Sequence, residues 1–337
     1  MNIQKYSVAL VTSLGSSKNS SAVAREIGVD QSTASRFLQI VGFDETEFKP
    51  MIARLFGNKS LNFVVDDSVI SRRYAKDTEG TSSMVDQSTK TFTNGCKIVV
   101  GGLTDGKFFL PICFEQWIAQ FILGDAYRKT TDIAKSLISK LLDLTINVKC
   151  FVMDGLYFSE EFIQWLHNKN LKFVIKAKTT TSVLYKGEKI QLKNCKDLRL
   201  NSNQSAKTIV AEWAGKMWYF TAVRRSGKRG PKIIYLISNF KTKSKMYAKI
   251  YNSRWTIEKC FRTTKQSLGL TDSFSQYART YLGHIKCVFF AFALMQLLMK
   301  KFRLNSTEDA IRKAQALKNM YGFHESVLQI SLLENYA

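Results

Sequence analysis

Two apolar segments of the chain each end in aspartate, at residues 61–67 (LNFVVDD) and 147–154 (NVKCFVMD). Both are rich in valine and phenylalanine, which favour β-strands, and both have the length of an ordinary strand. They therefore predict two core strands that each present a carboxylate at one end.

Further elements follow in an order that narrows the fold. Residues 96–103 and 107–114 predict a hairpin around residues 104–106, and residues 171–176 predict another core strand. Residues 131–142 have apolar side chains at helical spacing, and residues 159–167 suit a short helix. Three strands, a helix, a strand that ends in an acid and a further helix are the order of a ribonuclease H-like domain, so we expect an α/β fold of that kind.

The first fifty residues have a different pattern. Val23, Ala24 and Ile27 predict the apolar face of one helix, residues 34–38 predict a second, and Gly28 lies where a tight turn between them requires positive φ. This arrangement resembles a helix-turn-helix, whose second helix enters the major groove of DNA. It would turn these side chains towards DNA: Gln31, Ser32, Thr33, Ser35 and Arg36. The alternative is a helical domain with a structural or protein-binding role.

The formal net charge of +23 is concentrated in one part of the chain. Residues 1–50 contain five bases and five acids, whereas residues 172–249 contain 19 lysine and arginine residues against three acids. The latter region also predicts several short strands, so we expect a basic, β-rich insertion that contacts nucleic acid. The alternative is a solvated basic face. Trp213, Trp218 and Tyr219 of this region would either belong to the sheet core or stack on an unpaired base.

Cysteine and histidine give no support for a zinc or thiol site. The six cysteines are at least 17 positions apart and the three histidines are scattered, so any metal should be held by carboxylates. Residues 287–299 are apolar but too short to span a membrane, which favours a buried core helix. We expect a cytoplasmic protein that is not exported.

The stretch 251–266 (YNSRWTIEKCFRTTKQ) has the most specific local pattern. On a helix with Tyr251 at zero, Arg254, Glu258 and Lys265 fall at about 300°, 340° and 320°, on one narrow stripe. One carboxylate thus lies among two bases and a phenol, beside an apolar band. A salt-bridged surface is the ordinary explanation of such a stripe, but two further strand-end acids are available to join it.

With these residues the chain resembles the bacterial DDE insertion-sequence transposases, whose signature is Tyr-x2-Arg-x3-Glu-x6-Lys. Tyr251, Arg254, Glu258 and Lys265 match all four positions. The strand-end acids and the β-rich insertion before the glutamate also fit, over roughly residues 55–300. The resemblance implies a ribonuclease H-like catalytic domain (residues 55–176), interrupted by the insertion (177–240) and completed by a helical part (241–337). Residues 1–50 would form the helix-turn-helix-like domain.

The resemblance also implies the chemistry. Asp66, Asp154 and Glu258 would hold two Mg²⁺ ions, with Mn²⁺ as a substitute, for cleavage at the element's ends and strand transfer into target DNA. Tyr251, Arg254 and Lys265 would bind phosphates near the transposon end. The partners would be double-stranded DNA, as terminal inverted repeats and target, and a second copy of the chain in a homodimeric synaptic complex on the bacterial nucleoid.

The adjacent Asp66 and Asp67 leave one choice open. Side chains alternate along a strand, so only one of the two can point at the metals. We favour Asp66 because the family tends to place serine or threonine two residues after its aspartate, and Ser68 is in that position.

Other classes of protein remain possible from the sequence. A structure-specific nuclease of ribonuclease H-like fold would use the same acids to cut DNA without joining it. A non-catalytic helix-turn-helix protein would bind DNA and leave the three acids without a role, and an inactive transposase copy would retain them without activity.

Overall fold

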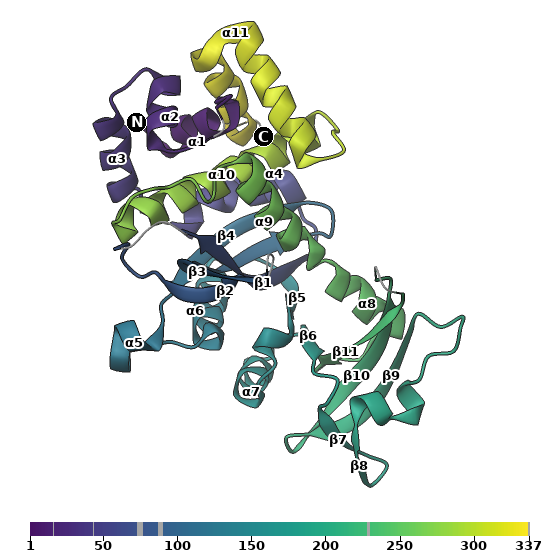
Figure 1. The fold of residues 1–337 in the computed structure, drawn as a ribbon. Helices are drawn as coiled ribbons and strands as arrows, with labels where there is room; N and C mark the ends of the chain where they lie inside the picture. The colour runs from purple at the N-terminus through teal and green to yellow at the C-terminus, as the bar shows by residue number, and fades with distance from the viewer. Residues whose placement is uncertain (16, 43, 73–76, 87–89, 228–229, 336–337) are drawn as a thin grey trace.

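An 11-stranded sheet runs through the molecule (Figure 1). The computed structural model describes residues 1–335 except 16, 43, 73–76, 87–89 and 228–229. The strands are hydrogen-bonded in the order β2-β3-β1-β5-β6-β11-β10-β9-β7-β8, and β4 pairs with β3. The chain is therefore a mixed α/β protein with a large and mostly antiparallel sheet.

The central strands bring two of the predicted acids to one edge. β1 is antiparallel to β3 but parallel to β5, with Val65 paired to Met153. β1 continues beyond Asp66 to Ser71, so the prediction that this strand ends at its acids is wrong. Asp66 and Asp154 lie near each other because they follow the paired residues Val65 and Met153 of parallel strands. The strands here are β1 (Leu61–Ser71), β2 (Ser82–Asp86), β3 (Thr91–Thr104), β4 (Phe109–Trp117), β5 (Val148–Met153) and β6 (Phe173–Ala177).

Helices cover both faces of these strands. In Figure 1, α6 (Thr130–Asp143) and α7 (Glu160–Asn168) lie below them, whereas α9 (Trp255–Ser267) and α10 (Ala278–Lys301) lie above. By length and composition α10 could cross a membrane, but 94% of its most apolar stretch is buried inside the protein. It is a core helix.

The N-terminal helices pack against α10 and the last helix, α11 (Thr307–Asn335), which is interrupted at Gly322. α3 crosses α10 so closely that a Cβ atom on Gly283 would lie 2.0 Å from the carbonyl oxygen of Leu38. Gly28 has a φ of 77°, the left-handed conformation that the turn between α2 and α3 requires. These helices are α1 (Ile3–Thr12), α2 (Ser20–Ile27), α3 (Gln31–Ile40) and α4 (Lys49–Phe56).

The basic, β-rich segment extends the sheet instead of forming a separate one. Its last strand, β11, pairs with β6 over four residue pairs, Val174–Ala177 with Tyr235–Ser238. Trp218 is only 1% exposed and its indole donates a hydrogen bond to the Trp213 carbonyl oxygen, so it is a core residue and cannot stack on a base. The elements are β7 (Ser182–Tyr185), β8 (Glu188–Gln191), β9 (Ala206–Trp213), β10 (Lys216–Arg225), β11 (Lys232–Ser238) and α8 (Ser244–Asn252).

The remaining elements are short connections. They are the helix α5 (Gln120–Leu123) and the 3₁₀ turns Glu45–Phe48, Gly124–Ala126, Gly155–Tyr157, Leu192–Asn194 and Lys196–Leu198.

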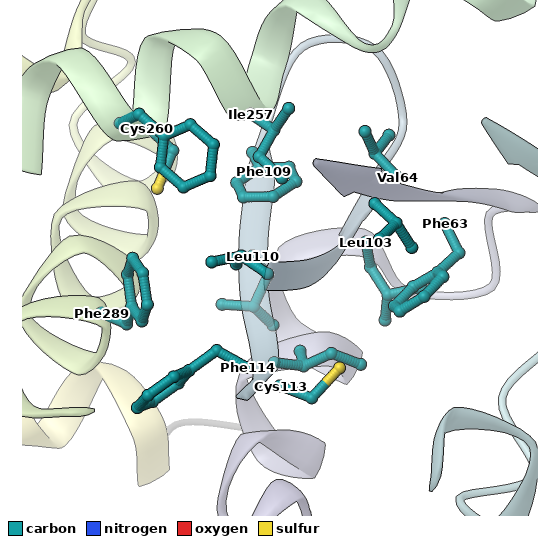
Figure 2. Close-up of a cluster of buried hydrophobic side chains, with 14 of the residues drawn as sticks. Phe63, Val64, Leu103, Phe109, Leu110, Cys113, Phe114, Ile257, Cys260 and Phe289 are labelled. Carbon is teal, nitrogen blue, oxygen red and sulfur yellow. The ribbon is translucent and has the colours of Figure 1, made fainter. Parts of the chain in front are cut away.

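A buried cluster fixes α9 on the central strands (Figure 2). Ile257 and Cys260 of α9 are fully buried, and Ile257 lies next to Phe109 of β4. The ring of Phe289 from α10 packs edge-on against Phe114 with the ring centroids 5.6 Å apart. Burial of these side chains stabilises the helix on the sheet and so sets where its polar face lies.

Candidate active site

Three carboxylates from three different elements meet around the guanidinium of Arg254. Its Nη1 donates to Oδ2 of Asp66 at 2.5 Å, and its Nη2 donates to Oε1 of Glu258. Asp154 lies close enough for the same charge to lower its pKa. Residues 66, 154 and 258 are far apart in the sequence, so the site exists only in the folded chain.

The pattern of β1 explains why Asp66 and not Asp67 faces this site. Val64 points towards α9 (Figure 2), and Asp66, two residues later, shares its face because side chains alternate along a strand. Asp67 lies on the other face, where its carboxylate is 3.1 Å from the Lys97 ammonium.

A tight turn between α8 and α9 places the other residues of the pattern. The amides of Arg254, Thr256 and Ile257 each donate to the carbonyl three residues back, so the stretch from Tyr251 is not the continuous α-helix that its spacing predicts. The hydroxyls of Ser253 and Thr256 donate to backbone carbonyls here, which accounts for the tighter turn. Tyr251 therefore lies in the last turn of α8, and Arg254 is the N-cap residue of α9.

Tyr251 and Lys176 hold Asp154. The Tyr251 hydroxyl donates to Oδ1 of Asp154 at 3.0 Å, and the Lys176 ammonium is 3.3 Å from the same oxygen. Tyr251 is itself only 1% exposed. Its phenol is thus turned towards the carboxylate and away from solvent.

Burial and charge act in opposite directions on the two aspartates. Burial raises the pKa of Asp66 to about 7, and the charge of Arg254 only partly opposes that rise. Burial opposes ionisation of Asp154, but the charges of Arg254 and Lys176 and the hydrogen bonds from the Gly155 amide and the Tyr251 hydroxyl outweigh it, so the pKa of Asp154 lies below its ordinary value. The pair therefore has one carboxyl that is costly to ionise and one that ionises readily.

The other residues predicted from the sequence lie apart from the three acids. Lys265 is partly buried, which lowers its pKa, and the charge of Asp86 on β2 only partly opposes that shift. On α3, Gln31 and Arg36 are exposed and Thr33 is partly buried. That helix lies at the N-terminal end of α10, away from α9 (Figure 1).

Sequence reasoning missed two residues of the site. Lys176 is the last residue but one of β6, the parallel neighbour of β5, so its position follows from strand pairing that the sequence pattern does not fix. Tyr157 is fully buried next to the acids, and among the described residues its hydroxyl has no hydrogen-bond partner. Its signal was the aromatic run that follows Asp154, but nothing in that run separates a site residue from a core residue.

The donor set has the chemistry of a divalent hard cation, since carboxylate oxygens are the ligands that Mg²⁺ prefers. As the side chains stand, the guanidinium of Arg254 lies between Asp66 and Glu258. In the part of the chain that the structure describes, no three acid, histidine or cysteine side chains are gathered closely enough to hold one ion. The side chains are therefore of the type that binds Mg²⁺, and in this structure the cation that pairs with them is the guanidinium of Arg254.

Comparison with known proteins gives one family match. A family model described as the transposase DDE domain matches residues 60–281, a range that contains all three acids. No curated protein matches the chain. Among solved structures, the NurA nuclease from Sulfolobus solfataricus is similar over 68% of this chain and 83% of its own, with 10% identity and a TM-score of 0.30. A TM-score this low supports no inference about fold or activity.

Proposed function

Because the chain belongs to the DDE transposase family, we propose that it cleaves DNA at the ends of an insertion sequence and joins those ends to target DNA. The observation that carries the proposal is the convergence of Asp66, Asp154 and Glu258 on one cation. Its DNA partners are the terminal inverted repeats and the target, and it acts in the cytoplasm of a bacterial cell.

The order of the central strands supports a ribonuclease H-like catalytic domain. β4, β3 and β1 form an antiparallel group, and β5 and β6 continue from β1 in parallel. In this proposal, residues 55–176 and 241–337 form the catalytic domain around the insertion 177–240. Residues 1–50 form the helix-turn-helix-like domain, with Gln31, Thr33 and Arg36 of α3 towards DNA.

Asp66, Asp154 and Glu258 are the residues that would hold Mg²⁺, or Mn²⁺ in its place. A pair of such ions makes the attacking water or 3′-hydroxyl more nucleophilic and stabilises the charge on the leaving oxygen. Three carboxylates suffice, because Mg²⁺ keeps several of its ligands as water and substrate oxygens.

The neighbouring residues balance the charge of the acids and fix their direction. Arg254 pairs with both Asp66 and Glu258 at a site where unpaired carboxylates would be costly. Tyr251 and Lys176 fix the direction of Asp154 by contacting the same oxygen. A hydrogen bond from the Tyr251 hydroxyl to a DNA phosphate requires that it first release Asp154, whereas Lys265 would reach phosphate by leaving the neighbourhood of Asp86.

A second copy of the chain is part of the proposal, since two transposon ends must be brought together for joining. We expect a homodimer in the complex with DNA.

The test is strand cleavage and joining on DNA that carries the element's own ends, with and without Mg²⁺. Wild type should cut and join only with the metal, and Glu258→Gln should lose both steps while it still binds DNA. Glu188→Gln is the matched control, because Glu188 is exposed on β8 in the insertion. Cleavage without joining would indicate a nuclease instead. Binding without metal-dependent chemistry in wild type would indicate a DNA-binding protein or an inactive copy.

A further inference from the structure

A row of exposed side chains runs along the outer side of α8 and α9. Its members follow one another at intervals of four or three residues, so they share one helical face. We call this row the basic stripe, and it consists of Lys245, Lys249, Asn252, Trp255, Lys259, Arg262 and Gln266.

The basic stripe contains four cations and no acid. Across residues 244–267 the one carboxylate is Glu258, and Arg254 already neutralises it. Exposed helices commonly alternate acids and bases at i,i+4 spacing, which stabilises them. Here like charges lie beside one another, so the row contributes little to the stability of the fold. It is suited to binding a polyanion.

Every residue of the basic stripe also lines one of two clefts. A cleft of about 650 Å³ is lined by its first four residues together with Arg224 and Arg225 of β10. A cleft of about 590 Å³ is lined by Lys259, Arg262 and Gln266 together with Lys107 from the turn between β3 and β4. The second cleft contains one acid, Glu308, against three bases. The positive charge is therefore presented in concave surface, where a rod-like ligand can approach several bases at once.

The stripe has the length of a DNA contact. α8 and α9 lie end to end (Figure 1), and at 1.5 Å per residue the distance from Lys245 to Gln266 is roughly 30 Å. That is close to one turn of a DNA duplex, about 34 Å.

The stripe also lies directly beside the acids. Around the axis of α9, Trp255, Lys259, Arg262 and Gln266 fall about 40° to 100° from Glu258, which is the next face of the helix. A DNA strand that follows the stripe thus passes alongside the carboxylates without displacing Arg254 or Tyr251, whose polar groups are engaged with them.

We propose that the basic stripe binds the phosphodiester backbone of a DNA duplex and aligns it with the three acids. This inference rests on the proposed function. Lysine and arginine bind phosphates without reading sequence, and the side-chain amides of Asn252 and Gln266 can donate to phosphate oxygens. The ligand is the same whether the duplex is the transposon end or the target, so the experiment separates those two sources.

The binding test uses Lys249→Gln/Lys259→Gln, because both residues are exposed and lie one in each cleft. Fluorescence anisotropy is measured from low to moderate salt in the presence of a chelator, with one duplex of the element's end and one of unrelated sequence. The log–log dependence of affinity on salt should become less steep by about 2, since each lost phosphate contact removes about 0.9 from the slope. Circular dichroism and thermal unfolding confirm that the variant is folded.

The matched control is Lys149→Gln/Lys169→Gln, which removes the same charge from two other exposed lysines. Lys149 lies at the start of β5, at the opposite end from Asp154, and Lys169 follows α7. Its salt dependence should equal that of wild type. An unchanged slope in the stripe variant, or an equal change in the control, would overturn the proposal.

The source of the duplex is read from cleavage and joining by the stripe variant. Retained cleavage with reduced joining assigns the stripe to target DNA, and a parallel loss of both assigns it to the transposon end; each outcome supports binding by the stripe. Because the binding measurement needs no metal, a wild type that fails to cleave would count against the proposed function alone. A normal salt slope in the stripe variant beside an active wild type would count against the stripe alone.

Discussion

Arg254 and Arg262 lie eight residues apart, at the start and in the third turn of the same helix, and their surroundings differ in every respect. Arg254 has a side chain only 13% exposed and is bonded to Asp66 and Glu258. Arg262 is exposed and lines an open cleft, and the acid four residues before it, Glu258, is bonded to Arg254.

One short helix therefore uses charge in two ways. On the inner side, low dielectric makes each charge costly, so the cation and the carboxylates must be held together. On the outer side water solvates the bases, their mutual repulsion is small, and they stay available for phosphates. The inner side can therefore tune chemistry, and the outer side can bind a substrate without disturbing it.

The largest effect should come from replacing the acid that faces α9. Asp66→Asn should slow metal-dependent cleavage by about a thousandfold or more, since metal coordination supplies several kcal/mol of transition-state stabilisation. Asp67→Asn, one residue away on the other face, should change the rate by about twofold or less. Single-turnover cleavage measures both rates. A large loss of rate in Asp67→Asn would mean that the alternation of side chains along β1 does not keep Asp67 out of the site.

The next effect is on stability and compares the two arginines directly. Arg254→Gln should lower the free energy of unfolding by about 4 kcal/mol, because it leaves buried carboxylates without a partner. Arg262→Gln should change it by about 0.5 kcal/mol or less. Urea unfolding in a chelator gives both values. Equal values would show that the inner and outer sides do not differ in energy.

The apolar anchor of α9 should have a slightly smaller effect. Ile257→Ala should cost about 3 kcal/mol, because Ile257 is fully buried and the cavity would lie between helix and sheet. Lys259→Ala, on the exposed side, serves as the control and should be within about 0.5 kcal/mol of wild type. Unfolding in urea again provides the measurement. A loss below 1 kcal/mol for Ile257→Ala would mean that the packing in Figure 2 does not hold α9 in place.

The smallest effect should come from the phenol that contacts Asp154. Tyr251→Phe removes one hydrogen bond and should lower the free energy of unfolding by about 1 kcal/mol. Tyr277→Phe, whose side chain is 64% exposed, should have no measurable effect. Thermal unfolding of wild type and the two variants side by side would show the difference. Equal melting temperatures would mean that the hydrogen bond from Tyr251 to Asp154 does not stabilise the fold.

Much of the secondary structure could be predicted from the sequence, because it depends on local apolar spacing. The predicted strands at 61–67, 96–103, 107–114, 147–154 and 171–176 lie at β1, β3, β4, β5 and β6. The turn at Ser253 and Arg254 could not be predicted, since its residues keep helical dihedral angles and only the hydrogen-bond pattern changes.

The candidate site was predicted as a set of residue types and not as an arrangement. The sequence spacing singles out Arg254 and Glu258, but it does not say that Arg254 also reaches Asp66, which is 188 positions away. Lys176 and Tyr157 depend on how distant strands pair and how a loop folds over them. Such contacts are set by tertiary packing, which a pattern along one chain does not contain.

The pairing of β6 with β11 also has a mechanical consequence. β5, which leads into Asp154, is hydrogen-bonded to β6, and β6 is hydrogen-bonded to β11, so residues 177–240 continue the sheet that carries Asp66. Bending across four paired residues would break backbone hydrogen bonds, whereas a flexible linker would swivel freely. Residues 177–240 therefore form a rigid extension of the central strands. A ligand bound to residues 177–240 is therefore held at a distance from the three carboxylates that the sheet fixes.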